Sequence, residues 1–162
     1  MPSREPQSTN YRKSDRMTVL IAEDDEDAIH LLEAALTDIA CEHTVRIVRD
    51  GQQALDYLQA KGEYEDRQKF PFPDVLVIDL NMPIVGGLEV LWWLSKHPEC
   101  SVLPTIVFTS SDEPSDIKRA YDLGASAYFV KPMGFDELKR VLRSTFEFWG
   151  KCVKPPLPPK CA

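Results

Sequence analysis

The stretch Asp-Val-Leu-Val-Ile-Asp-Leu-Asn-Met-Pro-Ile-Val-Gly-Gly, residues 74–87, decides the fold. Its apolar run Val75–Ile78 has no polar alternation, which is typical of a strand buried on both faces of a parallel sheet. The run stops at Asp79, and the turn residues that follow predict a loop. Ligands of open parallel sheets bind outside the carboxyl ends of the strands, so Asp79 is a candidate site residue. The alternative is that Asp79 only ends the strand or caps a helix.

The composition is that of one globular domain. The chain has 162 residues, 28% of them charged and 43% apolar, which is enough for a core but not for two ordinary domains. No apolar run reaches membrane-spanning length, and residues 1–16 lack the apolar segment of a secretory signal. We expect a cytoplasmic protein with no membrane contact. It should have a disordered tail at 1–16, a domain at 17–150 and an extended Pro-rich tail at 151–162.

The net charge of −7 is unevenly distributed. Residues 1–16 and 151–162 are basic, and subtracting their charges of +2 and +3 leaves −12 for residues 17–150. So acidic a domain repels nucleic acid phosphates and suits a cation. The four cysteines show no C-x-x-C spacing, which predicts free thiols and neither a zinc site nor a disulfide framework.

Four further apolar segments are predicted as strands. They are Thr18–Ala22, Thr44–Val48, Thr105–Phe108 and Ala127–Val130. Helical spacing of apolar residues predicts a helix after each of the five strands. Strands that alternate with helices indicate an α/β protein with a doubly wound, parallel (βα)5 sheet, because right-handed crossovers place helices on both faces. We expect the flavodoxin-like strand order 2-1-3-4-5.

Two of these helices carry aromatic residues whose direction can be predicted. In the helix 87–96, the stripe that includes Trp92 is expected to face inward and Trp93 to be partly exposed. In the last helix, 135–149, Phe148 lies off the apolar stripe and is expected to be exposed.

Functional side chains follow four of the predicted strands. Glu23 and Asp24 follow the first, Asp79 the third, Thr109 the fourth and Lys131 the fifth. Carboxylates near loop carbonyls suit a hard octahedral cation such as Mg²⁺. A metal ion, an amine and a hydroxyl together can bind the three oxygens of a phosphoryl group. The central carboxylate, Asp79, would then be a nucleophile that forms an aspartyl phosphate.

The motifs around these positions resemble the receiver domain of two-component response regulators. The matching motifs are Glu23-Asp24, Asp79-Leu80-Asn81-Met82-Pro83, Gly86-Gly87, Thr109-Ser110, Gly124-Ala125-Ser126-Ala127-Tyr128 and Lys131-Pro132. The resemblance extends over about residues 17–149. Counting the Asp79 motif and the Gly86-Gly87 turn as one, five motifs in the right order are highly specific.

The resemblance implies a role for each of these positions. Asp79 would accept a phosphoryl group from the phosphohistidine of a sensor histidine kinase. Asp24, Asp79 and the backbone carbonyl of Asn81 would ligate Mg²⁺, with Glu23 acting through a metal-bound water. Lys131 would pair with the phosphoryl oxygens.

Two further features follow from the same resemblance. A cis bond to Pro132 would fix the position of Lys131. Thr109 and Tyr128 match the switch pair of the family, in which the hydroxyl reaches the aspartyl phosphate and the ring turns inward.

A finer resemblance concerns the ends of the domain. No output domain follows residue 150, so we expect a stand-alone receiver that acts as a phosphoacceptor, with autophosphatase-type turnover at most, rather than as an enzyme. The long loop before residue 74 and the sequence Phe146-Glu147-Phe148-Trp149 resemble single-domain regulators paired with bacterial phytochromes. This predicts a homodimer through the face of the last strand and last helix, with Phe148 and Trp149 at the contact.

Three other functions remain open from the residues alone. A phosphatase with an aspartyl-phosphate intermediate usually has a second acid two residues after the nucleophile, where this chain has Asn81. A phosphorylation-independent interaction module would not need the complete set of site residues. A flavin-binding sheet would need apolar cradling loops, which are not evident.

Overall fold

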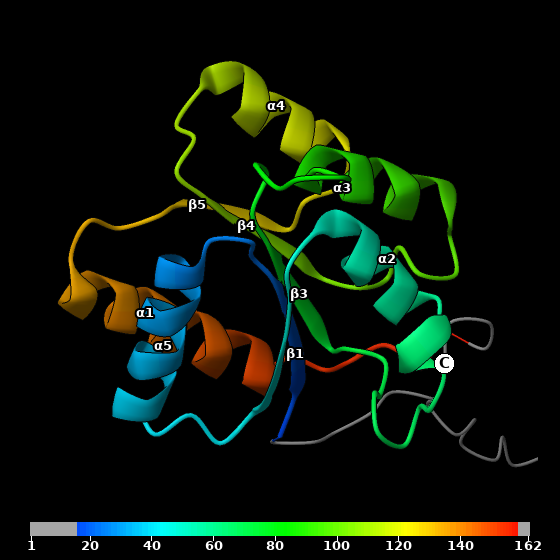
Figure 1. Ribbon diagram of the computed structural model, residues 1–162, viewed down its shortest axis with the longest axis horizontal. Helices are drawn as coiled ribbons and strands as arrows, with labels where there is room; N and C mark the ends of the chain where they lie inside the picture. Colours follow the sequence, from blue (N-terminus) through cyan, green and yellow to red (C-terminus); the bar gives the residue numbers. More distant parts are fainter. Residues whose placement is uncertain (1–15, 159–162) are drawn as a thin grey trace, which may run out of the picture.

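The computed structural model describes residues 16–158, which form one parallel sheet with helices on both faces (Figure 1). The strands are β1 (Thr18–Ala22), β2 (Thr44–Val48), β3 (Val75–Ile78), β4 (Thr105–Thr109) and β5 (Ala127–Val130). The helices are α1 (Glu26–Asp38), α2 (Gly51–Leu58), the 3-10 helix η1 (Gly62–Tyr64), α3 (Gly87–Lys96), α4 (Pro114–Asp122) and α5 (Phe135–Lys151). The strand order is β2-β1-β3-β4-β5, so the predicted flavodoxin-like sheet is confirmed.

Alternate residues of each strand pack on opposite faces of the sheet. Val19 and Ile21 of β1 belong to a core that includes residues of α1 and α5. Leu20 and Ala22 belong to a second core with residues of α2, α3 and α4. Figure 1 shows α1 and α5 together on one side of the sheet and α2, α3 and α4 on the opposite side. Within one strand, odd-numbered and even-numbered residues point to opposite faces. The position of a residue at the end of a strand therefore determines the face to which its side chain points.

One helix is rotated relative to the prediction. In α3 the buried residues are Gly87, Val90, Leu91 and Leu94, whereas Trp92 is 55% exposed. The prediction that Trp92 faces inward is therefore wrong. Trp93 is partly buried against the core, as expected. The reason is the phase of the helix: the residues at i, i+3, i+4 and i+7 from Gly87 face the sheet, and Trp92 lies outside that stripe.

Further expectations concern the ends and the cysteines. Residues 1–15 and 159–162, which are nearly all of the predicted tail 1–16 and the last four residues of the predicted tail 151–162, lie outside the described residues. Cys41 and Cys152 are free thiols, but Cys100, which is completely buried, forms a disulfide. The prediction of free thiols is wrong for Cys100, because spacing along the chain does not show which cysteines meet in the fold. Within residues 16–158, no helix combines the length and the apolarity that crossing a membrane requires.

The start of α3 lies against the end of the central strand. The Gly87 N–H donates to the Leu80 carbonyl at 3.0 Å. A Cβ atom built on Gly87 would lie 2.3 Å from the carbonyl oxygen of Asp79. Only glycine allows this approach, so the loop after β3 is held close to its own strand.

We expect Gly87→Ala to lower the free energy of unfolding by about 1–3 kcal/mol, because the backbone at Asp79 has to shift to admit the methyl group. Urea unfolding followed by circular dichroism measures this loss. Gly150→Ala in α5 is the matched control. Its Cβ would meet ordinary contacts of 3.6 Å or more, so the better helix propensity of alanine should raise stability by up to about 1 kcal/mol. Equal effects of the two substitutions would contradict the assignment.

Candidate functional site

Two buried carboxylates share one ammonium group at the carboxyl end of the sheet. Glu23 follows β1 and is 2% exposed, and Asp79 follows β3 and is 6% exposed. The Lys131 ammonium, which follows β5, lies 2.5 Å from Glu23 Oε2 and 2.7 Å from Asp79 Oδ2. All three have odd residue numbers, as do the residues of β1, β3 and β5 that face α1 and α5. The alternation of the strands therefore explains why they meet.

Burial and charge affect these groups in opposite ways. Burial raises the pKa of Glu23, and the hydrogen bond and charge of Lys131 only partly offset this. Burial also acts to lower the pKa of Lys131, but the hydrogen bonds to Asp79 and Glu23 outweigh it and raise that pKa. Lys131 is therefore a firmly charged ammonium at neutral pH, and it balances only part of the negative charge around it.

Asp24 completes a cluster that can hold a metal ion. One carboxylate oxygen each from Glu23, Asp24 and Asp79 lies within 4.8 Å of the others. Three carboxylates against one ammonium leave a formal charge of −2, which a divalent cation would neutralise. Oxygen ligands and a partly open position, provided by the more exposed Asp24, fit a hard cation that keeps some of its waters.

The loop after Asp79 is tightly folded. Asp79 Oδ1 accepts a hydrogen bond from the Asn81 N–H at 3.2 Å. Further along, the Val85 N–H donates to the Pro83 carbonyl at 2.8 Å, and Ile84 between them has a φ of 68°. A bond from residue i+2 to residue i with positive φ at the centre is a γ-turn, a rare and strained conformation for a β-branched residue.

A glycine in α2 anchors this loop. The Gly51 N–H donates to the Val85 carbonyl at 3.0 Å, and a Cβ on Gly51 would lie 2.2 Å from that carbonyl oxygen. The sequence analysis missed this contact. The Asp50-Gly51 pair signals a turn before a helix, but it gives no sign of the distant Val85.

Thr109 and Tyr128 lie on the other face of the sheet. Thr109 is completely buried, and its Oγ1 accepts a long hydrogen bond of 3.4 Å from the Ser111 N–H. The Tyr128 hydroxyl donates to the Ser111 carbonyl at 2.9 Å, and burial raises the pKa of this phenol, so the donor keeps its proton. Both side chains thus contact the start of the loop between β4 and α4. The role of Ser111 as their common partner was not predicted.

The expected cis peptide bond is absent. Residues 16–158 contain no cis peptide, so the bond before Pro132 is trans and that prediction is wrong. Lys131 is instead positioned by its N–H, which donates to the Thr109 carbonyl at 2.7 Å, and by its two carboxylate partners. These contacts fix the side chain without the less favourable isomer.

The geometry is matched by comparisons with known proteins. A family model described as the response regulator receiver domain matches residues 19–143. The chain belongs to this family. This receiver domain is 30% identical over 138 residues to Response regulator Rcp1 of Synechocystis sp., with 85% of this chain and 92% of Rcp1 covered. As a member of the family, it is a response regulator domain that accepts a phosphoryl group.

Solved structures show the same fold. The phosphorylated cyanobacterial phytochrome response regulator RcpA has 31% identity and a TM-score of 0.78, covering 86% of this chain and 99% of RcpA. Response regulator RPA3017, in red light signaling of R. palustris, has 32% identity and a TM-score of 0.80, covering 85% and 97%. The Mn²⁺-bound form of Rcp1 has 30% identity and a TM-score of 0.75, covering 86% and 99%. A divalent metal is therefore bound in a homologous receiver domain, and the acidic cluster here fits one.

Without a divalent cation, Lys131→Met should lower the free energy of unfolding by about 2–3 kcal/mol, because two buried carboxylates lose their counter-ion. The loss is below the full value for a buried pair because the Lys131 side chain is 20% exposed. Added Mg²⁺ should recover most of this stability, and the gain should exceed that of the wild type. Thermal unfolding with EDTA and with Mg²⁺ measures both effects.

Lys118→Met is the control, because the ion pair of Lys118 with Asp122 is exposed on α4 and contributes little. Its stability should change by less than about 0.5 kcal/mol, and its response to Mg²⁺ should equal that of the wild type. An equal Mg²⁺ gain in wild type and Lys131→Met would contradict a metal site next to Lys131.

Proposed function

We propose that Asp79 is the phosphoacceptor and that a sensor histidine kinase is the donor. One observation carries the proposal: a buried carboxylate at the end of the central strand lies 2.7 Å from a lysine and within reach of two further carboxylates. In the transfer, an oxygen of Asp79 forms a bond to phosphorus while the bond between phosphorus and the histidine nitrogen breaks. Lys131 is placed to pair with the oxygens of the arriving group.

We assign the metal site to the same cluster. The carboxylates of Asp24 and Asp79 and the backbone carbonyl of Asn81 are the proposed ligands, and Glu23 acts through a metal-bound water. We propose Mg²⁺, because the ligand atoms are oxygens only and few enough for the ion to keep several waters. When bound, the ion supplies positive charge that stabilises the phosphoryl oxygens. The domain itself, over residues 17–150, acts as a signalling protein and not as a turnover enzyme. Asn81 supports this, because an acid at that position would be needed to hydrolyse external esters.

The signal is proposed to leave the site through Thr109 and Tyr128. Among residues 16–158, the Thr109 hydroxyl has only a long hydrogen bond of 3.4 Å, so it is available to bind a phosphoryl oxygen. The Ser111 backbone, which contacts both side chains, would move with it and release the Tyr128 hydroxyl. Phosphorylation would then shift the population of the loop between β4 and α4.

The partners are inferred from relatives and from exposed side chains. RcpA is a phytochrome response regulator and RPA3017 belongs to red light signaling, which supports a phytochrome as the sensor kinase. We also propose a homodimer through β5 and α5. β5 is an edge strand, and Phe148 on α5 is 62% exposed and packs edge to face with Trp149.

Asp79→Asn should abolish labelling by acetyl phosphate and Mg²⁺, because the amide cannot act as the nucleophile. Intact-protein mass spectrometry should show a single phosphoryl adduct on the wild type and none on the variant. Asp112→Asn, an exposed acid in the loop between β4 and α4, is the control and should be labelled like the wild type. Light scattering on the same samples reports whether the adduct changes the oligomeric state. A labelled Asp79→Asn protein would contradict the assignment.

Thr109→Val should still be labelled, because Asp79 and Lys131 are intact, but its response to labelling should be lost. In the wild type, we expect the amide resonances of β5 and α4 to shift on phosphorylation. In the variant these shifts should shrink at least several-fold, since no hydroxyl binds the phosphoryl group. Ser110→Ala removes an adjacent, exposed hydroxyl and should respond like the wild type. Full shifts in Thr109→Val would exclude the switch role.

A further inference from the structure

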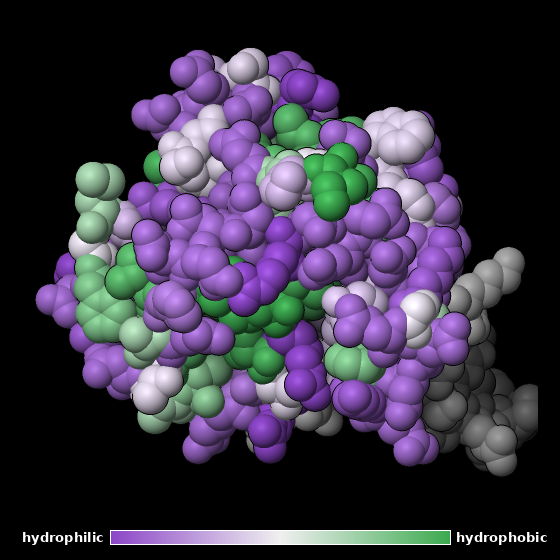
Figure 2. Space-filling view, viewed as in Figure 1, coloured by the Kyte–Doolittle hydropathy of each residue, from purple (hydrophilic) through white to green (hydrophobic). Residues whose placement is uncertain are grey.

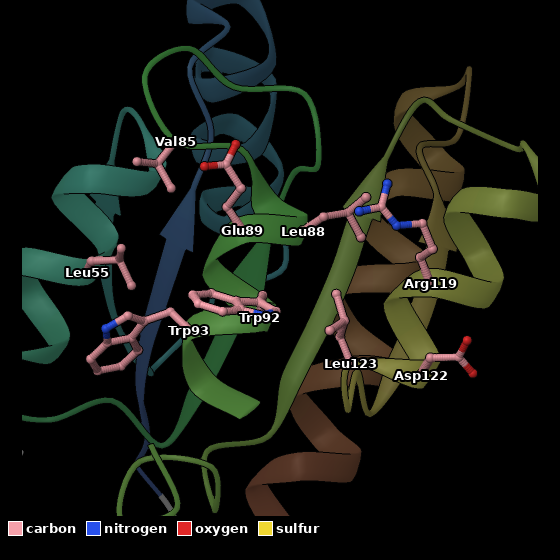
Figure 3. A pocket seen from close by; sticks show the side chains of 9 residues that line it. All are labelled: Leu55, Val85, Leu88, Glu89, Trp92, Trp93, Arg119, Asp122 and Leu123. Atoms are coloured by element: carbon pink, nitrogen blue, oxygen red, sulfur yellow. The ribbon is translucent and has the colours of Figure 1, made fainter. Parts of the chain in front are cut away.

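A groove on the face opposite α1 and α5 has no role in the site described above. It has a volume of about 450 Å³ and lies between α2, α3 and α4 (Figure 3). Its apolar lining comes mainly from Leu55, Val85, Leu88, Trp92, Trp93 and Leu123. In Figure 3, the Trp93 indole lies next to Leu55 of α2, and the Trp92 indole lies between Trp93 and the α4 side of the groove. The volume falls within the range of clefts that bind ligands.

The exposed indole in this groove is unusual. Trp92 is 55% exposed, although the helix that carries it buries four other residues. Its neighbour Trp93 stacks on the His97 ring with centroids 3.8 Å apart, which holds Trp93 in place beside it. Within residues 16–158, neither indole N–H has a hydrogen-bond acceptor. Tryptophans of this kind, rigid and amphipathic, are enriched where protein partners bind.

The charges at the rim are not equivalent. On α4, Asp122 forms an ion pair of 2.5 Å with Lys118, so that carboxylate is already neutralised. Across the groove, Glu89 contributes to the cap at the start of α3. The guanidinium of Arg119, in contrast, has no ion pair or hydrogen bond in the described part of the chain. The α4 side of the groove therefore offers an unpaired cation, which complements an acidic group on a partner.

The shape of the groove selects the kind of partner. Its walls are helices, whose backbone groups are already paired, so an added strand would find no main-chain partners there. The lining residues of α3 are spaced by one turn at Leu88 and Trp92, and those of α4 at Arg119 and Leu123. Such ridges accept the side chains of a third helix lying between them.

We propose that this groove binds an amphipathic helix of a partner protein, whose apolar stripe covers Trp92 and Leu88 and whose acidic residue pairs with Arg119. Recognition would follow the helix-in-groove mode, with apolar anchors about one turn apart. The proposal does not depend on phosphorylation of Asp79, because every contact it uses is present in the structure as it stands.

A display library of helical peptides of about 16 residues tests the proposal. Selection on the full chain should enrich sequences with apolar residues at i, i+3, i+4 and i+7 and an Asp or Glu at one fixed edge position. The best peptide should then be titrated into ¹⁵N-labelled protein. The indole resonances of Trp92 and Trp93 should shift, and that of Trp149, which lies on α5, should not. A shift of all three indoles alike would overturn the proposed location.

Variants separate the two parts of the contact. Trp92→Ala should weaken binding of the selected peptide at least tenfold, as expected of a central aromatic anchor. Arg119→Glu should weaken it about tenfold, and changing the acid of the peptide to Lys should restore the affinity. Both residues are exposed, so neither substitution should impair folding. Arg140→Glu on α5 is the control and should bind like the wild type.

Three results would overturn the proposal. One is that no selected peptide loses affinity for Trp92→Ala. Another is that the selected sequences lack the acid or bind Arg119→Glu unchanged, which would remove the charge pairing. The third is self-association seen in sedimentation that Trp92→Ala abolishes, which would make a second copy of this chain the occupant.

Discussion

Two buried carboxylates that share one ammonium group constrain the rest of the structure. Glu23 and Asp79 have lost most of their hydration, and Lys131 together with one backbone N–H for each carboxylate offsets part of that cost. The domain therefore carries an excess of negative charge at a buried position, where the side chains cannot move out into water. Such a site is stabilised by whatever brings positive charge, so the binding of a metal ion and the stability of the domain are linked.

The loop after the central strand is held by contacts that leave little freedom. Gly87 and Gly51 each allow a backbone approach that no other residue would permit, and between them Ile84 adopts a φ of 68° with its side chain 79% exposed. Strain of this kind costs of order 1–3 kcal/mol and persists only because the neighbouring contacts enforce it. The backbone contacts of Gly87 and Gly51 therefore connect the loop after Asp79, through Val85, to α2 over a short distance.

The sequence predicted those features that depend on local patterns or on topology. Apolar runs located all five strands, and the parallel order brought Glu23, Asp79 and Lys131 together, because the ends of parallel strands meet at one edge. The misses all depend on distant parts of the chain. The direction of Trp92 follows from how α3 docks, the disulfide of Cys100 from which thiols meet, and the trans bond before Pro132 from contacts that already position the lysine. Nothing in the residues marks Ile84, since positive φ favours Gly or Asn.

The alternation of side chains along the strands divides the site between the two faces of the sheet. Glu23, Asp79 and Lys131 lie on the face toward α1 and α5, whereas Thr109 and Tyr128 lie toward α4. One residue added to or deleted from β3 or β5 would move Asp79 or Lys131 to the other face of the sheet, because a shift of one residue reverses the direction of the side chains. Insertions and deletions in related domains should therefore be found only at the amino ends of the strands, in loops such as residues 59–74. The strands that end at the site should keep their lengths.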